Sequence, residues 1–113
     1  MAYLLLSFLL MATACATHPA PPPPEAAPFN AEAHLSSASK RALAGQYAPA
    51  LEEIELVLAH QPGNADAYLA KGGILGMMGL YRDAIDALKQ SAHMGNAKAR
   101  SILNEHRIDW GEQ

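Results

Sequence analysis

An eight-residue stretch of this chain is repeated 34 residues further along. Residues 45–52 read Gly-Gln-Tyr-Ala-Pro-Ala-Leu-Glu and residues 79–86 read Gly-Leu-Tyr-Arg-Asp-Ala-Ile-Asp, so glycine, tyrosine, alanine, a branched aliphatic residue and a carboxylate return in register. A period of about 34 residues is typical of a helical pair that cannot bury its apolar face alone and stacks on the next pair. The repeat therefore predicts an array of helices, and it indicates a binding surface before any catalytic residue is considered.

Hydrophobic residues recur at helical spacing through most of the chain after residue 30. Asn30 follows closely on a proline and suits an N-cap, so a first helix is expected to begin after it and to stop near Gly45. Proline, glycine and asparagine interrupt the pattern at later points. The further helices are expected over 48–60, 65–78, 81–94 and 97–107.

Three glycines, Gly72, Gly73 and Gly76, lie inside the third of these helices. Each interior glycine costs roughly 0.8–1 kcal/mol relative to alanine. A helix that carries all three is therefore expected to be held by tertiary packing. We expect Gly72 to be a point at which a neighbouring backbone comes close, because the missing side chain permits that approach.

The first 11 residues are apolar apart from one serine, and they carry no charge. This run is shorter than the roughly 20 residues that cross a bilayer, and small residues follow it, which is typical of a secretory signal segment. Residues 1–14 are therefore predicted to be a signal peptide. No Lys or Arg precedes the run, where a positive charge is expected, and a misassigned start codon would explain that.

Cys15 is the only cysteine, so an intramolecular disulfide is excluded, and its neighbours lack the histidine and acid of a catalytic nucleophile. Its position in Met11-Ala12-Thr13-Ala14-Cys15 resembles the lipobox of bacterial lipoproteins, although Ala12 stands where that family usually has leucine. The resemblance implies cleavage before Cys15 and acylation of its sulfur and amino group. Ordinary signal-peptidase cleavage after Ala14 and a retained N-terminus are the two alternatives.

Residues 15–29 are predicted to form a linker that begins with the modified cysteine. Six of the eight prolines lie between residues 17 and 28, with no glycine and with Glu25 as the only charge. Such a run favours polyproline II at roughly 3.1 Å per residue, which makes a stiff stalk of about 40 Å. A proline-rich ligand for an aromatic groove is the alternative, and the position beside Cys15 favours a spacer.

The 34-residue pattern resembles the tetratricopeptide repeat family over about residues 31–107. The resemblance implies an all-α solenoid of two helix-turn-helix units, 31–64 and 65–98, followed by a C-terminal capping helix. The helical domain would span 30–108 and a tail 109–113. The matching positions are small residues, the glycine and tyrosine between helices, and a terminal proline: Ala38, Gly72, Ala50, Ala84, Gly45, Gly79, Tyr47, Tyr81 and Pro62.

In such repeats the first helix of each unit lines a groove that binds extended peptides or partner helices. By position, the resemblance assigns this lining to Glu32, Leu35, Ser39, Ala42, Asp66, Leu69, Gly73, Gly76 and Met77. Capture of a chaperone carboxylate needs Lys, Asn and Arg there, and it is not expected because aliphatic residues, serine and glycine stand in their place. An apolar groove opened by glycine favours an aliphatic segment or a second copy of the chain. The alternative is that Leu35, Leu69 and Met77 are only core residues.

No pattern for catalysis or cofactor binding is found in the sequence. The net charge of −3 is too small to indicate nucleic acid as a partner. The five histidines lack metal-ligand spacing to acids or cysteines, and residues 71–76 lack the ending of a phosphate-binding loop. Glu52, Glu53 and Glu55 are expected on a solvated helix face, and Trp110 is expected to pack on the last helix. No enzyme activity, cofactor or metal is expected.

Together these features predict a non-catalytic adaptor. It would be a small lipoprotein of the bacterial cell envelope, anchored through Cys15 on the periplasmic side of the outer membrane, or else periplasmic. Its groove would bind a peptide or helix of a partner protein in an assembly such as a secretion, pilus or cell-wall machinery. The alternative is a self-associating structural subunit with no separate ligand.

Overall fold

The chain is all-α over the residues that the computed structural model describes, 19–24 and 26–111. Within these ranges the helices are α1 (Ala31–Leu43), α2 (Tyr47–His60), α3 (Ala65–Met77), α4 (Tyr81–His93) and α5 (Ala97–Glu105). Each begins and ends within one or two residues of its predicted bounds. The predicted fold class is therefore confirmed.

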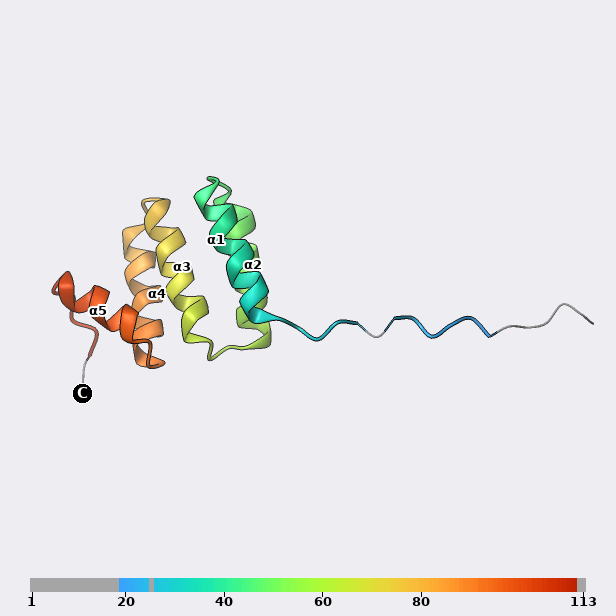
Figure 1. The fold of residues 1–113 in the computed structure, drawn as a ribbon. Helices are drawn as coiled ribbons and strands as arrows, with labels where there is room; N and C mark the ends of the chain where they lie inside the picture. The colour runs from blue at the N-terminus through green and yellow to red at the C-terminus, as the bar shows by residue number, and fades with distance from the viewer. Residues whose placement is uncertain (1–18, 25, 112–113) are drawn as a thin grey trace, which may run out of the picture.

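Consecutive helices pack against each other in two antiparallel hairpins, and a single helix follows them. The hairpin α1–α2 lies beside the hairpin α3–α4 in the same orientation, and α5 packs on α4 at the far side (Figure 1). α1 also contacts α3. Residues 19–28, apart from the undescribed residue 25, run away from the domain with no secondary structure. This arrangement is that of an α-helical repeat solenoid.

An asparagine caps the first helix of each hairpin and also α5. Asn30, Asn64 and Asn96 have extended backbone, and each side-chain oxygen accepts a hydrogen bond from the backbone N–H three residues later. The donors are Ala33 at 3.0 Å, Ala67 at 2.9 Å and Ala99 at 2.9 Å. The same capping chemistry therefore sets where α1, α3 and α5 begin.

The two glycines of the repeated stretch end the first helix of each hairpin in the same way. Gly45 and Gly79 both have φ of +79°, a conformation that favours glycine. The next N–H then bonds back into the helix, from Gln46 to the Arg41 carbonyl at 2.8 Å and from Leu80 to the Leu75 carbonyl at 2.9 Å. The two hairpins therefore turn with the same glycine conformation and the same hydrogen bond.

The core consists of three small clusters, because the helices are short and carry many alanines. The first joins α1, α2 and the inner face of α3 around Ile54 and Val57. The second joins α4 and α5 around Leu103. The third lies between α3 and α4 around Leu75, and Leu51 of α2 packs on it.

Trp110 packs into the domain, as expected, although the predicted tail began at residue 109. Its side chain is 8% exposed and belongs to the α4–α5 cluster. The indole Nε1 donates a hydrogen bond to Asn104 Oδ1 at 2.9 Å, and the ring meets His93 edge-on at 5.8 Å. The packed domain therefore extends to Trp110, two residues beyond the predicted boundary.

Some of the sequence-based predictions lie outside the described residues. They are the signal peptide over 1–14 and the acylation of Cys15, which stay predictions. Among the residues that the structure describes, none of the helices combines the length and the hydrophobicity needed to span a bilayer.

Candidate functional site

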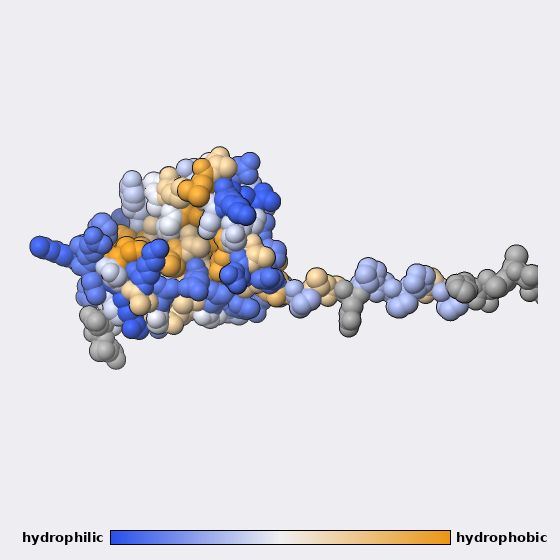
Figure 2. Space-filling model, in the orientation of Figure 1, coloured by the Kyte–Doolittle hydropathy of each residue, from blue (hydrophilic) through white to orange (hydrophobic). Residues whose placement is uncertain are grey.

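Three helices line an open groove of about 540 Å³ along one side of the domain. α1, α3 and α5 each contribute residues to it, and Figure 2 shows hydrophobic surface on the domain next to α5. The groove contains seven of the nine residues that the family resemblance assigned to a binding surface: Leu35, Ser39, Ala42, Asp66, Leu69, Gly73 and Met77. The register inferred from the repeat therefore brings residues 34 positions apart to one surface.

The other two predicted residues lie elsewhere. Gly76 lines a neighbouring groove of about 420 Å³ between α3, α4 and α5. Glu32 lines neither groove and is exposed in the first turn of α1. Leu69 and Gly73 line both grooves, so the two form one continuous apolar surface over α3.

The aliphatic residues of the groove also contribute to the core. Leu35 packs on the first cluster and Leu69 on the second, and both side chains are partly exposed. Met77 is different, because 48% of it is exposed. The alternative that all three are only core residues therefore does not hold for Met77.

The three glycines of α3 serve different purposes. A Cβ at Gly72 would lie 2.9 Å from Leu88 Cγ and 3.2 Å from the Ala84 carbonyl oxygen, so a side chain there would force α4 to shift. A Cβ at Gly73 or Gly76 would meet nothing within 4 Å. Packing within the chain thus explains Gly72, as expected, but not the other two. Gly73 and Gly76 instead leave the backbone of α3 open to whatever enters the grooves.

The polarity of the main groove changes along its length. Asp66 lies in the first turn of α3, where its Oδ1 accepts a hydrogen bond from Asn96 Nδ2 at 2.8 Å. Lys98 lies near the start of α5 and lines the same end of the groove. Leu43 and Met77 line the other end. A segment bound along the groove would therefore meet charges at one end and aliphatic side chains at the other.

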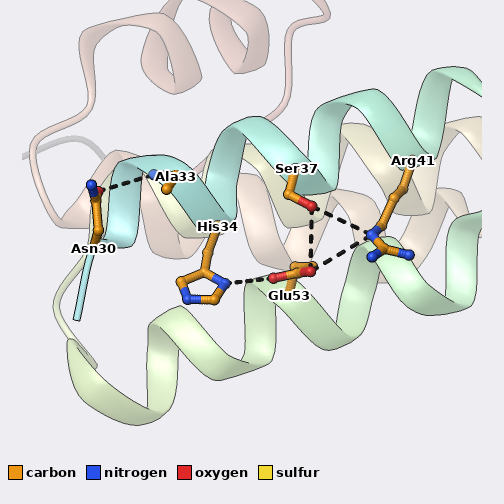
Figure 3. Close-up of polar contacts among 6 residues, drawn as sticks. All are labelled: Asn30, Ala33, His34, Ser37, Arg41 and Glu53. Carbon is orange, nitrogen blue, oxygen red and sulfur yellow. Dashed lines mark hydrogen bonds and ion pairs between the residues drawn. The ribbon is translucent and has the colours of Figure 1, made fainter. Parts of the chain in front are cut away.

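A polar network joins α1 to α2 (Figure 3). Glu53 of α2 lies at its centre: His34 Nδ1 is 2.5 Å from Oε2, the Ser37 hydroxyl donates to Oε1 at 3.3 Å, and Arg41 Nε is 3.6 Å from Oε1. The Glu53 side chain is only 20% exposed. The expectation that Glu53 lies on a solvated face is therefore wrong. The signal that was missed is the spacing of His34, Ser37 and Arg41, which form one stripe of a helix.

The environment of Glu53 favours its ionised form. The hydrogen bond with His34 lowers the pKa of the Glu53 carboxyl, and partial burial opposes this effect. The charge of protonated His34, the Ser37 hydroxyl and Arg41 lower the pKa further. The network therefore stabilises a carboxylate between two helices rather than preparing an acid for catalysis.

Phe29 connects the linker to the same region. Its ring stacks on His34 at 5.0 Å and on His60 at 3.9 Å between ring centroids, with interplanar angles of 15° and 13°. Phe29 also packs on the α1–α2–α3 cluster. Neither Phe29 nor His60 was expected from the sequence to have a role in packing. The observed contacts fasten the last residue of the linker to both helices of the first hairpin.

Within the described ranges, His, Cys, Asp and Glu side chains do not gather in groups of three that could hold a metal ion. The chain was compared with protein-family models, with curated proteins and with solved structures, and none of these comparisons gave a match. What bears on function is thus the repeat, the two grooves and the distribution of charge in this chain itself.

Proposed function

We propose that this chain is a non-catalytic adaptor whose groove binds a peptide or helix of a partner protein. The observation that carries the proposal is the groove of about 540 Å³ that α1, α3 and α5 line together. Its size falls in the range of ligand sites, and it is lined largely by apolar side chains. Gly73 leaves helix backbone accessible inside it. Such a surface suits close packing of another polypeptide segment.

We further infer that the two hairpins are tetratricopeptide-type repeats. The sequence period, the paired Gly45 and Gly79 turns and the asparagine-capped first helices support this inference. In that family the first helices of successive units line the binding groove. α1 and α3 do so here, and α5 takes the place of a third first helix.

The proposed location is the bacterial cell envelope, with a lipid anchor on Cys15. The support is the order of segments along the chain: an apolar run, a cysteine after small residues, and a proline-rich linker. Residues 19–24 and 26–28 are exposed and extended, which suits a spacer. Such a spacer would set how far the domain can move from the membrane that holds the anchor.

Photo-cross-linking in the native envelope tests the adaptor function. A photoreactive amino acid replaces Met77, which is exposed in the groove, or Leu56, which is 42% exposed on α2 and lines no described groove. We expect a discrete cross-linked protein, identified by mass spectrometry, from position 77 and not from position 56. Equal labelling from both positions, or none from position 77, would contradict the proposal.

A substitution that fills the groove tests the same proposal without touching the core. Gly73→Leu places a side chain where nothing lies within 4 Å, so the fold should be kept while the cross-link from position 77 disappears. Sedimentation across a wide concentration range decides the self-association alternative. A dimer of the wild-type chain that Gly73→Leu dissociates would replace the adaptor with a self-assembling subunit.

The anchor has a test of its own. Labelled fatty acid should be incorporated into the wild-type chain and not into Cys15→Ser. Stable anchoring takes more than one acyl chain, so the variant should also be released from the membrane fraction. A mature N-terminus other than Cys15 would refute acylation and leave the adaptor proposal standing.

A further inference from the structure

One end of the domain carries most of its exposed large hydrophobic side chains. The turns α1–α2 and α3–α4 lie together at this end, which we call the turn end (Figure 1). The residues are Leu43 (80% exposed), Met77 (48%), Met78 (40%), Leu80 (44%) and Tyr81 (70%). They come from the ends of α1 and α3 and from the start of α4. Exposed apolar residues gathered in this way indicate an interaction surface.

The turn end is also the basic end of the domain. Lys40 and Arg41 lie in the last turn of α1, and Arg82 follows Tyr81 in α4. Asp83 is the only acid in the first turns of α2 and α4. Among the described residues, Arg41 contacts Glu53, while Lys40 and Arg82 form no ion pair. With Glu53 and Asp83 counted against Lys40, Arg41 and Arg82, the turn end keeps a small net positive charge, although the whole chain carries a net charge of −3.

The opposite end of the domain carries charged and titratable side chains of both kinds. Glu32 and Asp66 lie in the first turns of α1 and α3, with His60 and His93 in the last turns of α2 and α4. Lys98 lies at this end as well, and Arg100 Nε donates a hydrogen bond to the Ala92 carbonyl there at 3.0 Å. What distinguishes the turn end is therefore that its bases lie beside most of the exposed large hydrophobic side chains.

We propose that the turn end binds the surface of an anionic lipid bilayer. Leucine and methionine side chains that project from turns can enter the boundary between headgroups and acyl chains, and a tyrosine is favoured at that depth. Lysine and arginine beside them attract anionic headgroups. Figure 2 shows hydrophobic and hydrophilic surface side by side over this end, as such a surface requires.

A second copy of the chain fits the turn end less well. A symmetric contact through it would bring Lys40 and Arg82 of one copy close to the same residues of the other. Like charges at close range oppose that contact, whereas an anionic bilayer is attracted by them. The charge of the turn end therefore favours lipid as its occupant.

The linker permits this contact even when an anchor lies at the start of the chain. It joins the domain at Asn30, at the end of α1 far from the turn end. Ten residues from 19 to 28 in polyproline II span about 30 Å, whereas a helix of 13 residues is about 20 Å long. The linker is thus long enough for the turn end to reach the surface that holds an anchor. The inference does not depend on the anchor.

An environment-sensitive dye placed on the turn end tests the inference. Leu43→Cys in a Cys15→Ser chain carries the dye, and Leu56→Cys carries it at an exposed leucine of α2 as the matched control. With vesicles that contain phosphatidylglycerol, we expect a blue shift at position 43 only. The probe reports contact of that side chain itself, so membrane binding by residues 1–14 does not produce the result. Circular dichroism of each labelled chain confirms the fold.

The charge requirement has a separate readout. Neutral phosphatidylcholine vesicles should give a much weaker shift at position 43, and Lys40→Gln and Arg82→Gln should each lower partitioning about fivefold. Equal shifts at positions 43 and 56, or equal binding to neutral and anionic vesicles, would overturn the inference. A shift at position 43 that depends on protein concentration without vesicles would assign the turn end to a second copy. Leu43 also lines one end of the main groove, so the groove proposal is tested separately by Gly73→Leu.

Discussion

The two helices of each hairpin meet along a line of contact, which we call the seam. The side chains in the seam are polar in the first hairpin and apolar in the second. In α1–α2, Glu53 accepts hydrogen bonds across the seam from residues of α1. In α3–α4, the position 34 residues later is Ala87, which is 5% exposed. Arg41 of the first hairpin likewise corresponds to Leu75 of the second, which is 7% exposed. One sequence pattern therefore supports a polar seam in one unit and an apolar seam in the next.

The difference follows from the position of each hairpin in the array. Leu51 of α2 packs on the seam of the second hairpin, around Leu75 and Ala87. Among the described residues, only the linker and Phe29 precede the first hairpin, so no preceding helix covers its seam. A repeat at the edge of an array needs a polar outer face, whereas an inner repeat needs an apolar one. The Glu53 network is thus the N-terminal cap of this solenoid.

The contact between helices also differs in the size of its partners. Ala38 and Ile54 are both fully buried where α1 meets α2. The corresponding residues in the second hairpin are Gly72 and Leu88, and a Cβ at Gly72 would force α4 to shift. Leucine and isoleucine are isomers of equal volume, so the second contact holds one methyl group less than the first. The branching of the aliphatic side chain also differs, at the γ carbon in Leu88 and at the β carbon in Ile54.

The largest expected loss of stability is at the C-terminal edge of the array, where Trp110 covers the α4–α5 cluster. Trp110→Ala removes the edge-on contact with His93, the packing on the α4–α5 cluster around Leu103, and the hydrogen bond to Asn104. We expect a loss of about 3 kcal/mol in the free energy of unfolding, measured with urea. Trp110→Phe keeps an apolar ring and should cost less. A loss below about 0.5 kcal/mol for Trp110→Ala, the range of an ordinary surface change, would show that this edge needs no aromatic closure.

The second-largest loss of stability is expected at Gly72, which packs against α4, and little loss is expected at its neighbour Gly73, which faces the groove. Gly72→Val should lower the free energy of unfolding by about 2 kcal/mol, because the new side chain overlaps Leu88 and the Ala84 carbonyl. Gly73→Val is the matched control. It meets nothing within 4 Å and should change stability by no more than about 0.5 kcal/mol. Equal losses would mean that helix propensity, not the α3–α4 contact, governs both sites.

A smaller effect is expected at the polar seam of the first hairpin. Glu53→Ala leaves His34, Ser37 and Arg41 without their shared acceptor, and we expect a loss of about 1 kcal/mol. Glu52→Ala removes an exposed carboxylate from the adjacent position and should stay within about 0.5 kcal/mol of the wild type. Thermal unfolding followed by circular dichroism distinguishes the two. If both variants melt alike, the seam is not held by this network.

Much of the fold was predictable because it depends on local signals. Asparagine caps and the repeated glycines set the helix ends, and the 34-residue register placed seven predicted residues in one groove. The caps and turns are read from residues close together in the chain, and the register from two stretches 34 residues apart. The observation that they repeat then fixes how the helices stack.

The features that were missed depend on what lies beside each helix. Glu52, Glu53 and Glu55 look alike in the sequence, and only the stripe of α1 next to α2 makes Glu53 a partner of His34. Trp110 was expected to pack on the last helix, and it does, but its contact with His93 of α4 could not be read from the sequence. The sequence also did not show which glycine of α3 packs against a neighbouring helix. Gly72 and Gly73 are adjacent, but Gly72 faces α4 and Gly73 faces an open groove.

The smallest expected effect is a pH dependence that belongs to the first hairpin alone. The pKa of Glu53 is lowered in the folded chain, chiefly by the hydrogen bond with His34. A carboxyl whose pKa is lower in the folded state adds stability at pH values above its unfolded pKa, about 4.3, and this contribution is lost as pH falls through the folded pKa. From about pH 5 to about pH 3, the wild type should therefore lose more stability than Glu53→Gln.

Glu52→Gln keeps the network and should follow the wild-type curve. Curves for wild type and Glu53→Gln that stay parallel across this range would show that ionised Glu53 contributes nothing to the seam. The second hairpin has Ala87 at the corresponding position, so the same acid titration should leave its contacts unchanged.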